Sequence, residues 1–263
     1  SIFRSSPLNG TAIPVNSVTP KHNPARVALP PYHPDLPKIR WDWALYYDKM
    51  ENMDARAGEI LRELEELGET ENTIVFYYSD HGGVLARSKR YLYETGTKVP
   101  FIIRIPEKYR YLYPAGAPGE KVDRIISFVD LAPTLLSLTG LQAPPDYQGR
   151  AFLGPKATGP PEYVHLTRGR MDERIDMSRA VRDRKFRYIR NYMPFRIPLQ
   201  HLSFLFIANS AQAWEEAFEA GACNDIQSVP FRPRPVEELY DTENDPWEVH
   251  NLAGDPAYAD KLA

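Results

Sequence analysis

The sequence predicts an α/β protein in which part of a mixed, mostly parallel sheet is flanked by helices and followed by a small α+β subdomain with an antiparallel sheet. Two observations predict it. An apolar stripe at helical spacing runs through residues 41–67 and leads into the apolar and aromatic run 74–78, as in half of a βαβ unit. Beyond residue 162, short segments alternate apolar and polar residues, which is typical of half-exposed antiparallel strands.

Composition limits the class of partner. The chain has 263 residues, 43% of them hydrophobic and 25% charged, with a formal net charge of -3. This balance predicts no nucleic-acid partner. No apolar run approaches the roughly 20 residues of a membrane span, so we expect no membrane-spanning segment. The single cysteine, Cys223, excludes an intrachain disulfide framework and is interpreted as an ordinary thiol.

The first part of the chain predicts a loop, a helix and a strand. Residues 1–40 are rich in proline, which restricts the backbone, so we expect an extended loop with His22 and His33 at the surface. The helix over 41–67 should end at Gly68, and the run 73–79 that follows predicts a buried strand.

The rest of the chain predicts further strands and helices. We expect a second strand over 101–105 and a helix beginning near Asp130, with that residue as its cap and Pro133 in its first turn. We divide the chain into a larger α/β part, residues 1–155, and a small α+β part, residues 156–263. The second part should hold strands, one helix and a last strand, in this order: 163–166, 178–182, 186–190, 211–220 and 237–241.

Candidate site residues follow the strand predicted at 73–79. The strand ends at Asp80 and His81, and ligands bind beyond the carboxyl ends of strands in α/β sheets. Asp and neutral His are good ligands for divalent metals. Lys89 follows in the basic cluster 87–90. A metal-binding pair followed by an ammonium group is what a site for a sulfate or phosphate ester requires.

Asp-His-Gly alone is also typical of a turn or a helix cap, but the whole stretch is more specific. A strand, the motif at residues 79–82, Lys89, the segment 93–96 and a second strand together resemble the type I, formylglycine-dependent sulfatases of the alkaline phosphatase superfamily. The chain resembles this family over roughly residues 41–255, and the resemblance implies an alkaline-phosphatase-like fold. Further matching segments are residues 46–61, 128–136 and 238–252.

The resemblance implies specific roles. By position, Asp80 and His81 look like ligands of a Ca²⁺ ion, and Lys89 looks like the lysine that binds the sulfate group. It implies a sulfuric ester hydrolase that removes sulfate from a sulfated small molecule or carbohydrate. Histidine after Asp80 keeps a second class open, a phosphoester or phosphonate hydrolase of the same superfamily with Zn²⁺ or Mn²⁺. A third alternative is a non-catalytic half that binds a partner or a glycan.

The chain departs from the family in its nucleophile. The family uses a formylglycine made from a Cys/Ser-x-Pro-x-Arg motif, which is absent here; residues 5–9 have only part of its spacing. We therefore expect the C-terminal portion of a sulfatase, inactive alone, with the missing N-terminal half as its partner. Its sheet should expose apolar surface unless another chain covers it. Such sulfatases are often exported, which is consistent with a periplasmic or extracellular location, but the sequence leaves the compartment open.

A polar loop in the second part is the candidate for substrate specificity. Residues 164–174 are dense in groups that hydrogen-bond sugar hydroxyls or acidic groups. We expect Arg170, Asp172 and His165 to bind substrate. The alternative is a surface network of ion pairs.

Overall fold

A computed structural model describes residues 18–170 and 172–262 of the chain. Residues 5–9, which have part of the spacing of the nucleophile motif, lie outside this part. No helix within the described ranges combines the length and the apolar character that crossing a membrane requires.

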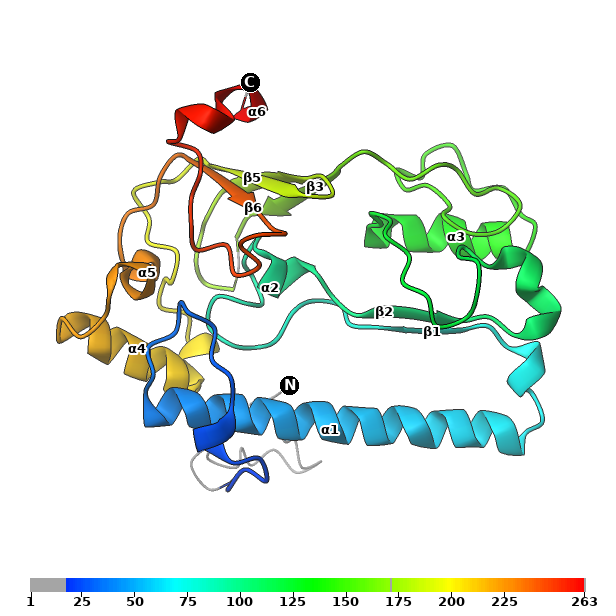
Figure 1. The fold of residues 1–263 in the computed structure, drawn as a ribbon, viewed down its shortest axis with the longest axis horizontal. Helices are drawn as coiled ribbons and strands as arrows, with labels where there is room; N and C mark the ends of the chain where they lie inside the picture. Colours follow the sequence, from blue (N-terminus) through cyan, green and yellow to red (C-terminus); the bar gives the residue numbers. More distant parts are fainter. Residues whose placement is uncertain (1–17, 171, 263) are drawn as a thin grey trace.

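The first part of the chain is layered around two strands (Figure 1). The long helix α1 (Pro37–Glu66) runs along one edge of the molecule. The strands β1 (Val75–Tyr78) and β2 (Phe101–Arg104) lie in the middle, and α3 (Leu131–Leu138) lies on their other side. The α/β class is thereby confirmed.

Helix α1 begins four residues earlier than predicted, because Pro37 in its first turn needs no hydrogen-bond partner for its nitrogen. Gly68 follows the helix with a φ of 70°, as expected of a C-terminal stop. The buried residues of α1 all lie in its first half. There Asp42 accepts a hydrogen bond of 2.7 Å from the backbone amide of Ser210, which fastens α1 to the first turn of α4 (Asn209–Glu219).

Strands β1 and β2 pair antiparallel, with Val75 opposite Arg104. This differs from the mostly parallel sheet that we expected; within the described ranges every strand pair is antiparallel. The connection from β1 to β2 contains only the one-turn helix α2 (Glu94–Thr97). A parallel return needs a crossover that is usually a full helix, and none is formed here.

The β1–β2 pair is half-exposed rather than buried. The hydroxyl of Tyr77 donates a hydrogen bond to the Met53 sulfur on α1, while the ring of Tyr78 lies 5.4 Å from that of Phe128. Ile102, paired with Tyr77, is 60% exposed, and Ile60 on the second half of α1 is also exposed. This arrangement agrees with the expectation that the first sheet leaves apolar surface uncovered.

Helix α3 follows a 3-10 turn and begins close to the predicted position. Asp130 lies at its start, but its carboxylate does not cap α3 as we expected. It accepts hydrogen bonds from the backbone amides of Ser127 and Arg150, at 2.9 and 2.8 Å. The side chain therefore ties the turn before the helix to the loop after it.

The second sheet is antiparallel with the order β3-β4-β5-β6, as the alternating pattern predicted. Its strands differ from the predicted ranges by no more than two residues at either end. The strands are β3 (Val164–Arg168), β4 (Ser178–Arg182), β5 (Phe186–Asn191) and β6 (Glu237–Asp241), and the remaining helices are α5 (Asp225–Ser228) and α6 (Ala259–Leu262).

One hydrophobic core joins both parts of the chain. It combines Tyr91 and Tyr93 of the β1–β2 connection with Ile189 of β5 and the fully buried Trp214 of α4. The division at residue 155 stays a prediction, and this core includes residues from both sides of it. The same core contacts His33, which is 3% exposed, so the expectation of a surface histidine was wrong there.

Candidate functional site

Asp80 and His81 lie in the turn that follows β1. The carboxylate of Asp80 is 81% exposed, and its Oδ2 lies 3.4 Å from His81 Nε2. His81 Nδ1 lies 2.7 Å from the carbonyl oxygen of Gly82. Because a carbonyl only accepts, Nδ1 carries a proton, and in the neutral imidazole the lone pair is then on Nε2. A backbone carbonyl that fixes the tautomer in this way is a common companion of metal-binding histidines.

These two side chains fit two ligand positions of a divalent cation. The free lone pair of His81 and an exposed carboxylate oxygen lie close enough to bind one ion. One nitrogen and one oxygen donor suit Zn²⁺ or Mn²⁺ at least as well as Ca²⁺, which takes oxygen ligands. Further ligands have to come from other residues.

Lys89 returns to this turn through a closed loop. Its backbone amide donates a 2.9 Å hydrogen bond to the carbonyl of Gly83, two residues after His81. Arg87 and Arg90 on either side of it have φ values of 64° and 82°, which bend the loop sharply. Across residues 18–170 and 172–262, the Lys89 ammonium has no hydrogen-bond or ion-pair partner. The loop thus presents a free positive charge.

Helix α2 holds both ends of the site together. The amide of Gly82 donates to the carbonyl of Gly96 at 3.0 Å, and the Ser88 and Thr95 hydroxyls donate to the carbonyls of Thr95 and Arg87, both at 2.7 Å. A Cβ added to Gly82 or Gly96 would overlap backbone atoms of residues 88–96. The glycines are visible in the sequence, but the role of Thr95 is not.

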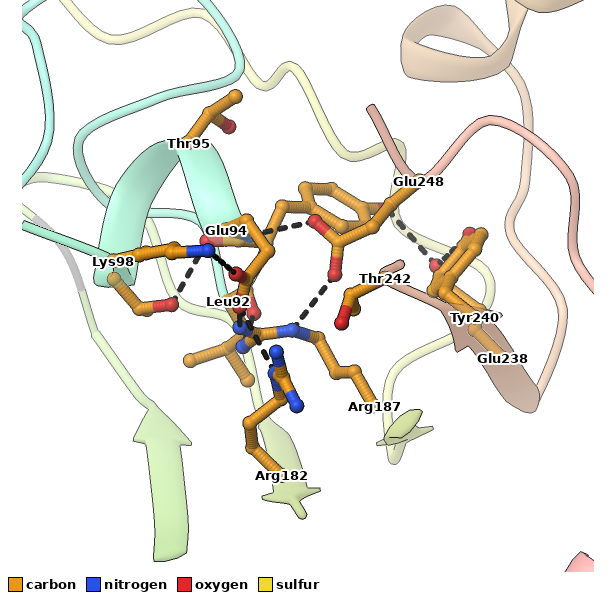
Figure 2. Close-up of polar contacts among 12 residues, drawn as sticks. Leu92, Glu94, Thr95, Lys98, Arg182, Arg187, Glu238, Tyr240, Thr242 and Glu248 are labelled. Atoms are coloured by element: carbon orange, nitrogen blue, oxygen red, sulfur yellow. Dashed lines mark hydrogen bonds and ion pairs between the residues drawn. The ribbon is translucent and has the colours of Figure 1, made fainter. Parts of the chain in front are cut away.

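A charged cluster lies at the start of α2 and consists of Glu94 of that helix with Arg182, Arg187 and Glu248 (Figure 2). Glu94 binds both guanidinium groups, and Arg187 also pairs with Glu248, Nε to Oε1, at 2.7 Å. Burial acts to raise the pKa of Glu94, but the two arginines outweigh it and lower that pKa below its ordinary value. Burial raises the pKa of Glu248 to about 7, and Arg187 and Arg87 offset only part of this. No pattern in the sequence indicates that these distant residues meet.

The predicted specificity residues separate in the structure. Asp172 reaches the site loop, because Arg90 Nε donates to its Oδ2 at 2.8 Å, and Arg170 Nε donates to the Asp172 carbonyl at 3.2 Å. His165 does not join them. His165 lies opposite Val181 of the neighbouring strand, so these two side chains share one face of the sheet. The next residue, Arg182, has its side chain on the other face, where it binds Glu94 of α2. His165 therefore lies on the face of the sheet that points away from α2.

The comparisons with known proteins agree with this architecture. The sulfatase family model matches residues 32–141. An ulvan-active sulfatase of Formosa agariphila is 40% identical over 240 residues, which is 89% of this chain and 38% of that protein. This chain belongs to the sulfatase family. The sulfatase chain thus spans less than half the length of that relative.

Solved structures share the fold of this sulfatase chain. One, solved with its substrate D-glucosamine-2-N,6-O-disulfate, has a TM-score of 0.57 and 24% identity, covering 85% of this chain and 38% of that one. The phosphonate monoester hydrolase of Agrobacterium radiobacter also has a TM-score of 0.57, with 21% identity, covering 86% of this chain and 40% of that one. At such identities the likeness shows the alkaline-phosphatase-like fold alone.

Proposed function

We propose that this chain supplies the sulfate-binding part of an enzyme that removes sulfate from a sulfated carbohydrate. The observation that carries the proposal is the hydrogen bond from the Lys89 amide to Gly83, which holds the backbone of a lysine with no side-chain partner in the described residues beside the Asp80–His81 turn. In a low-dielectric site, a fixed cation stabilises negative charge that develops on ester oxygens. Names of similar proteins, an ulvan-active sulfatase and a glucosamine disulfate complex, support the substrate class.

Asp80 and His81 are proposed to bind the divalent cation of this site. The Gly82 carbonyl holds the His81 ring so that Nε2 and the Asp80 carboxylate offer adjacent lone pairs. A cation bound there would neutralise charge on the sulfate oxygens. Ca²⁺ is the ion that the resemblance implies, with Zn²⁺ or Mn²⁺ as the alternatives that a nitrogen ligand favours.

The formylglycine nucleophile and the remaining ligands are proposed to lie in a complementary part of the enzyme. The exposed apolar residues of β2 and α1, such as Ile102 and Ile60, offer that part a surface to pack against. Burying such side chains would stabilise the assembly by about 1.5–3 kcal/mol for each one fully covered.

Substrate specificity is proposed to involve the loop that carries Arg170 and Asp172. The Asp172 carboxylate binds Arg90, next to Lys89 in sequence, so this loop touches the site through that pair. Asp172 then acts by orienting Arg90, while the exposed Arg170, held through Nε by the Asp172 carbonyl, can offer its terminal NH₂ groups to an acidic group of a sugar. The position of His165 on the far face of the sheet gives it no support as a substrate ligand.

A phosphonate or phosphoester hydrolase remains the second candidate. The His81 nitrogen donor and the fold shared with the phosphonate monoester hydrolase favour it. The deciding experiment is an assay of this chain with its complementary part on a sulfated monosaccharide and on a phosphonate monoester. The proposal expects sulfate release from the combination and none from either part alone, whereas faster phosphonate hydrolysis would reverse the assignment.

Replacing Lys89 tests the site itself. Lys89→Ala should lower kcat/KM for sulfate release at least a hundredfold, because a single fixed charge or donor at such a site contributes about that much. Lys121→Ala, which removes an exposed lysine elsewhere, is the matched control and should leave the rate unchanged. Equal rates for the two variants would show that Lys89 does not act in the site. If the chain and its complementary part together bind the glycan but release no sulfate, a non-catalytic glycan-binding half is favoured.

A further inference from the structure

Glu248 is the point at which three distant parts of the chain meet (Figure 2). Its Oε2 accepts a 2.6 Å hydrogen bond from the Glu94 amide, the first amide of α2. Its Oε1 pairs with Arg187 of β5, and its own carbonyl accepts a 2.6 Å hydrogen bond from Arg87. The side chain is fully buried, and its backbone has a φ of 51°, which few residue types adopt without strain.

Helix α2 connects Glu248 to both halves of the candidate site. One link is the hydrogen bond from the Gly82 amide to Gly96, directly beside the Asp80–His81 turn. The other is the pair of hydroxyl hydrogen bonds that join Thr95 to Arg87 and Ser88, directly before Lys89. Any movement of α2 therefore shifts the metal-ligand turn and the lysine loop together.

We propose that Glu248 is a positioning residue for the anion site, holding α2 so that the Asp80–His81 turn and the Lys89 loop keep one relative geometry. The proposal rests on the proposed function only for the statement that the site binds sulfate. A carboxylate is needed because both of its oxygens receive donors, the Glu94 amide and the Arg187 guanidinium. A glutamine offers one acceptor only and would turn its NH₂ group toward one of those donors.

A purely structural role predicts a different outcome from a positioning role. Removing one partner of a buried ion pair destabilises a protein as a whole. Removing Glu248 and Arg187 together, as Glu248→Met with Arg187→Met, relieves the uncompensated charge, because Arg182 still pairs with Glu94, but leaves the first amide of α2 uncapped. Under the positioning role the double variant regains overall stability without regaining the geometry of the site.

The test is native-state hydrogen exchange on the chain 1–263 at a pH above 7, where the Glu248 carboxyl is ionised in the folded protein, followed at three amides. Gly82 and Lys89 report the two halves of the site through their bonds to Gly96 and Gly83, and Ile189 reports the second sheet. Glu248→Gln should speed exchange at Gly82 and Lys89 at least tenfold more than at Ile189. The exposed Glu243→Gln is the matched control and should change none of them.

The double variant should return exchange at Ile189 to the wild-type rate while Gly82 and Lys89 stay fast. Equal acceleration at all three amides in Glu248→Gln, or none at Gly82 and Lys89, would overturn the proposal. Inorganic sulfate provides the second measurement: its Kd for the chain combined with the complementary part should rise at least tenfold in Glu248→Gln. If the wild type binds no sulfate while the exchange pattern holds, the proposed function fails and the positioning role of Glu248 stands.

Discussion

Protonation of His33 should weaken the fold as the pH falls. The imidazole lies among the rings of Tyr32, Trp43 and Trp214, with centroid distances of 4.8, 6.0 and 4.5 Å. Burial, reinforced by the Arg87 charge, lowers its pKa from 6.5 to about 3. The folded protein therefore keeps His33 neutral at pH values at which the unfolded chain protonates it.

The pKa shift of His33 sets both the direction and the size of the effect. A base whose folded pKa is depressed contributes stability that is fully present above its unfolded pKa and is lost as the pH falls toward its folded pKa. The shift from 6.5 to about 3 corresponds to an upper value of about 5 kcal/mol, lost at about 1.4 kcal/mol per pH unit. Between pH 7 and pH 5 the loss should be about 2 kcal/mol.

Urea unfolding at pH 7, 6 and 5 measures this loss. The perturbation is His33→Phe, which keeps an aromatic ring in the aromatic surroundings and removes the titrating group. The free energy of unfolding of the wild type, minus that of the variant, should fall by about 2 kcal/mol from pH 7 to pH 5. The exposed His165→Phe is the control and should follow the wild type. A difference that stays constant across this range would refute the reasoning.

Further predictions concern buried groups and close packing. The folded pKa of Glu248 is raised to about 7, so the stability that this group contributes is present below its unfolded pKa of 4.5 and is lost as the pH rises to about 7. The loss amounts to up to about 3 kcal/mol. Glu248→Gln should abolish it in the same urea series. In denaturant titrations, Gly96→Ala should lower the free energy of unfolding by about 1–3 kcal/mol, because the added Cβ would overlap backbone carbonyl oxygens. Gly254→Ala is the control and should be near neutral, because its Cβ would meet open space. Trp214→Ala should lower it by about 3–5 kcal/mol by emptying the centre of the core, measured by the loss in thermal midpoint.

Much of the secondary structure could be predicted because local patterns decide it. The stripe in α1 and the alternation in β3 to β6 are properties of neighbouring residues, so their ranges were predicted closely. The chain directions in the first sheet were not predictable in the same way. They depend on how the connection between β1 and β2 folds, and that connection is held by contacts with the second sheet, such as Arg187 to Glu94.

The candidate site also has features that the sequence predicts and features that only the folded chain shows. Asp80, His81 and Lys89 stand out in the sequence because their residue types and spacing suit a metal and an anion, and their roles stay predictions. The lone pair left on His81 follows from a backbone contact that only the folded turn provides. The contact of Asp172 with Arg90 likewise required the tertiary structure.

The sequence by itself determined the family, the order of the strands and the three longer helices, and the residues that offer charge and lone pairs at 80–89, because each of these depends on residues close together in the chain. Only the tertiary structure decided that α2 joins both halves of the site, that His33 is buried and that Glu248 caps α2. The burial of His33 against Trp214 and the cap by Glu248 on Glu94 link residues more than 150 positions apart, and no local pattern encodes a contact across that separation.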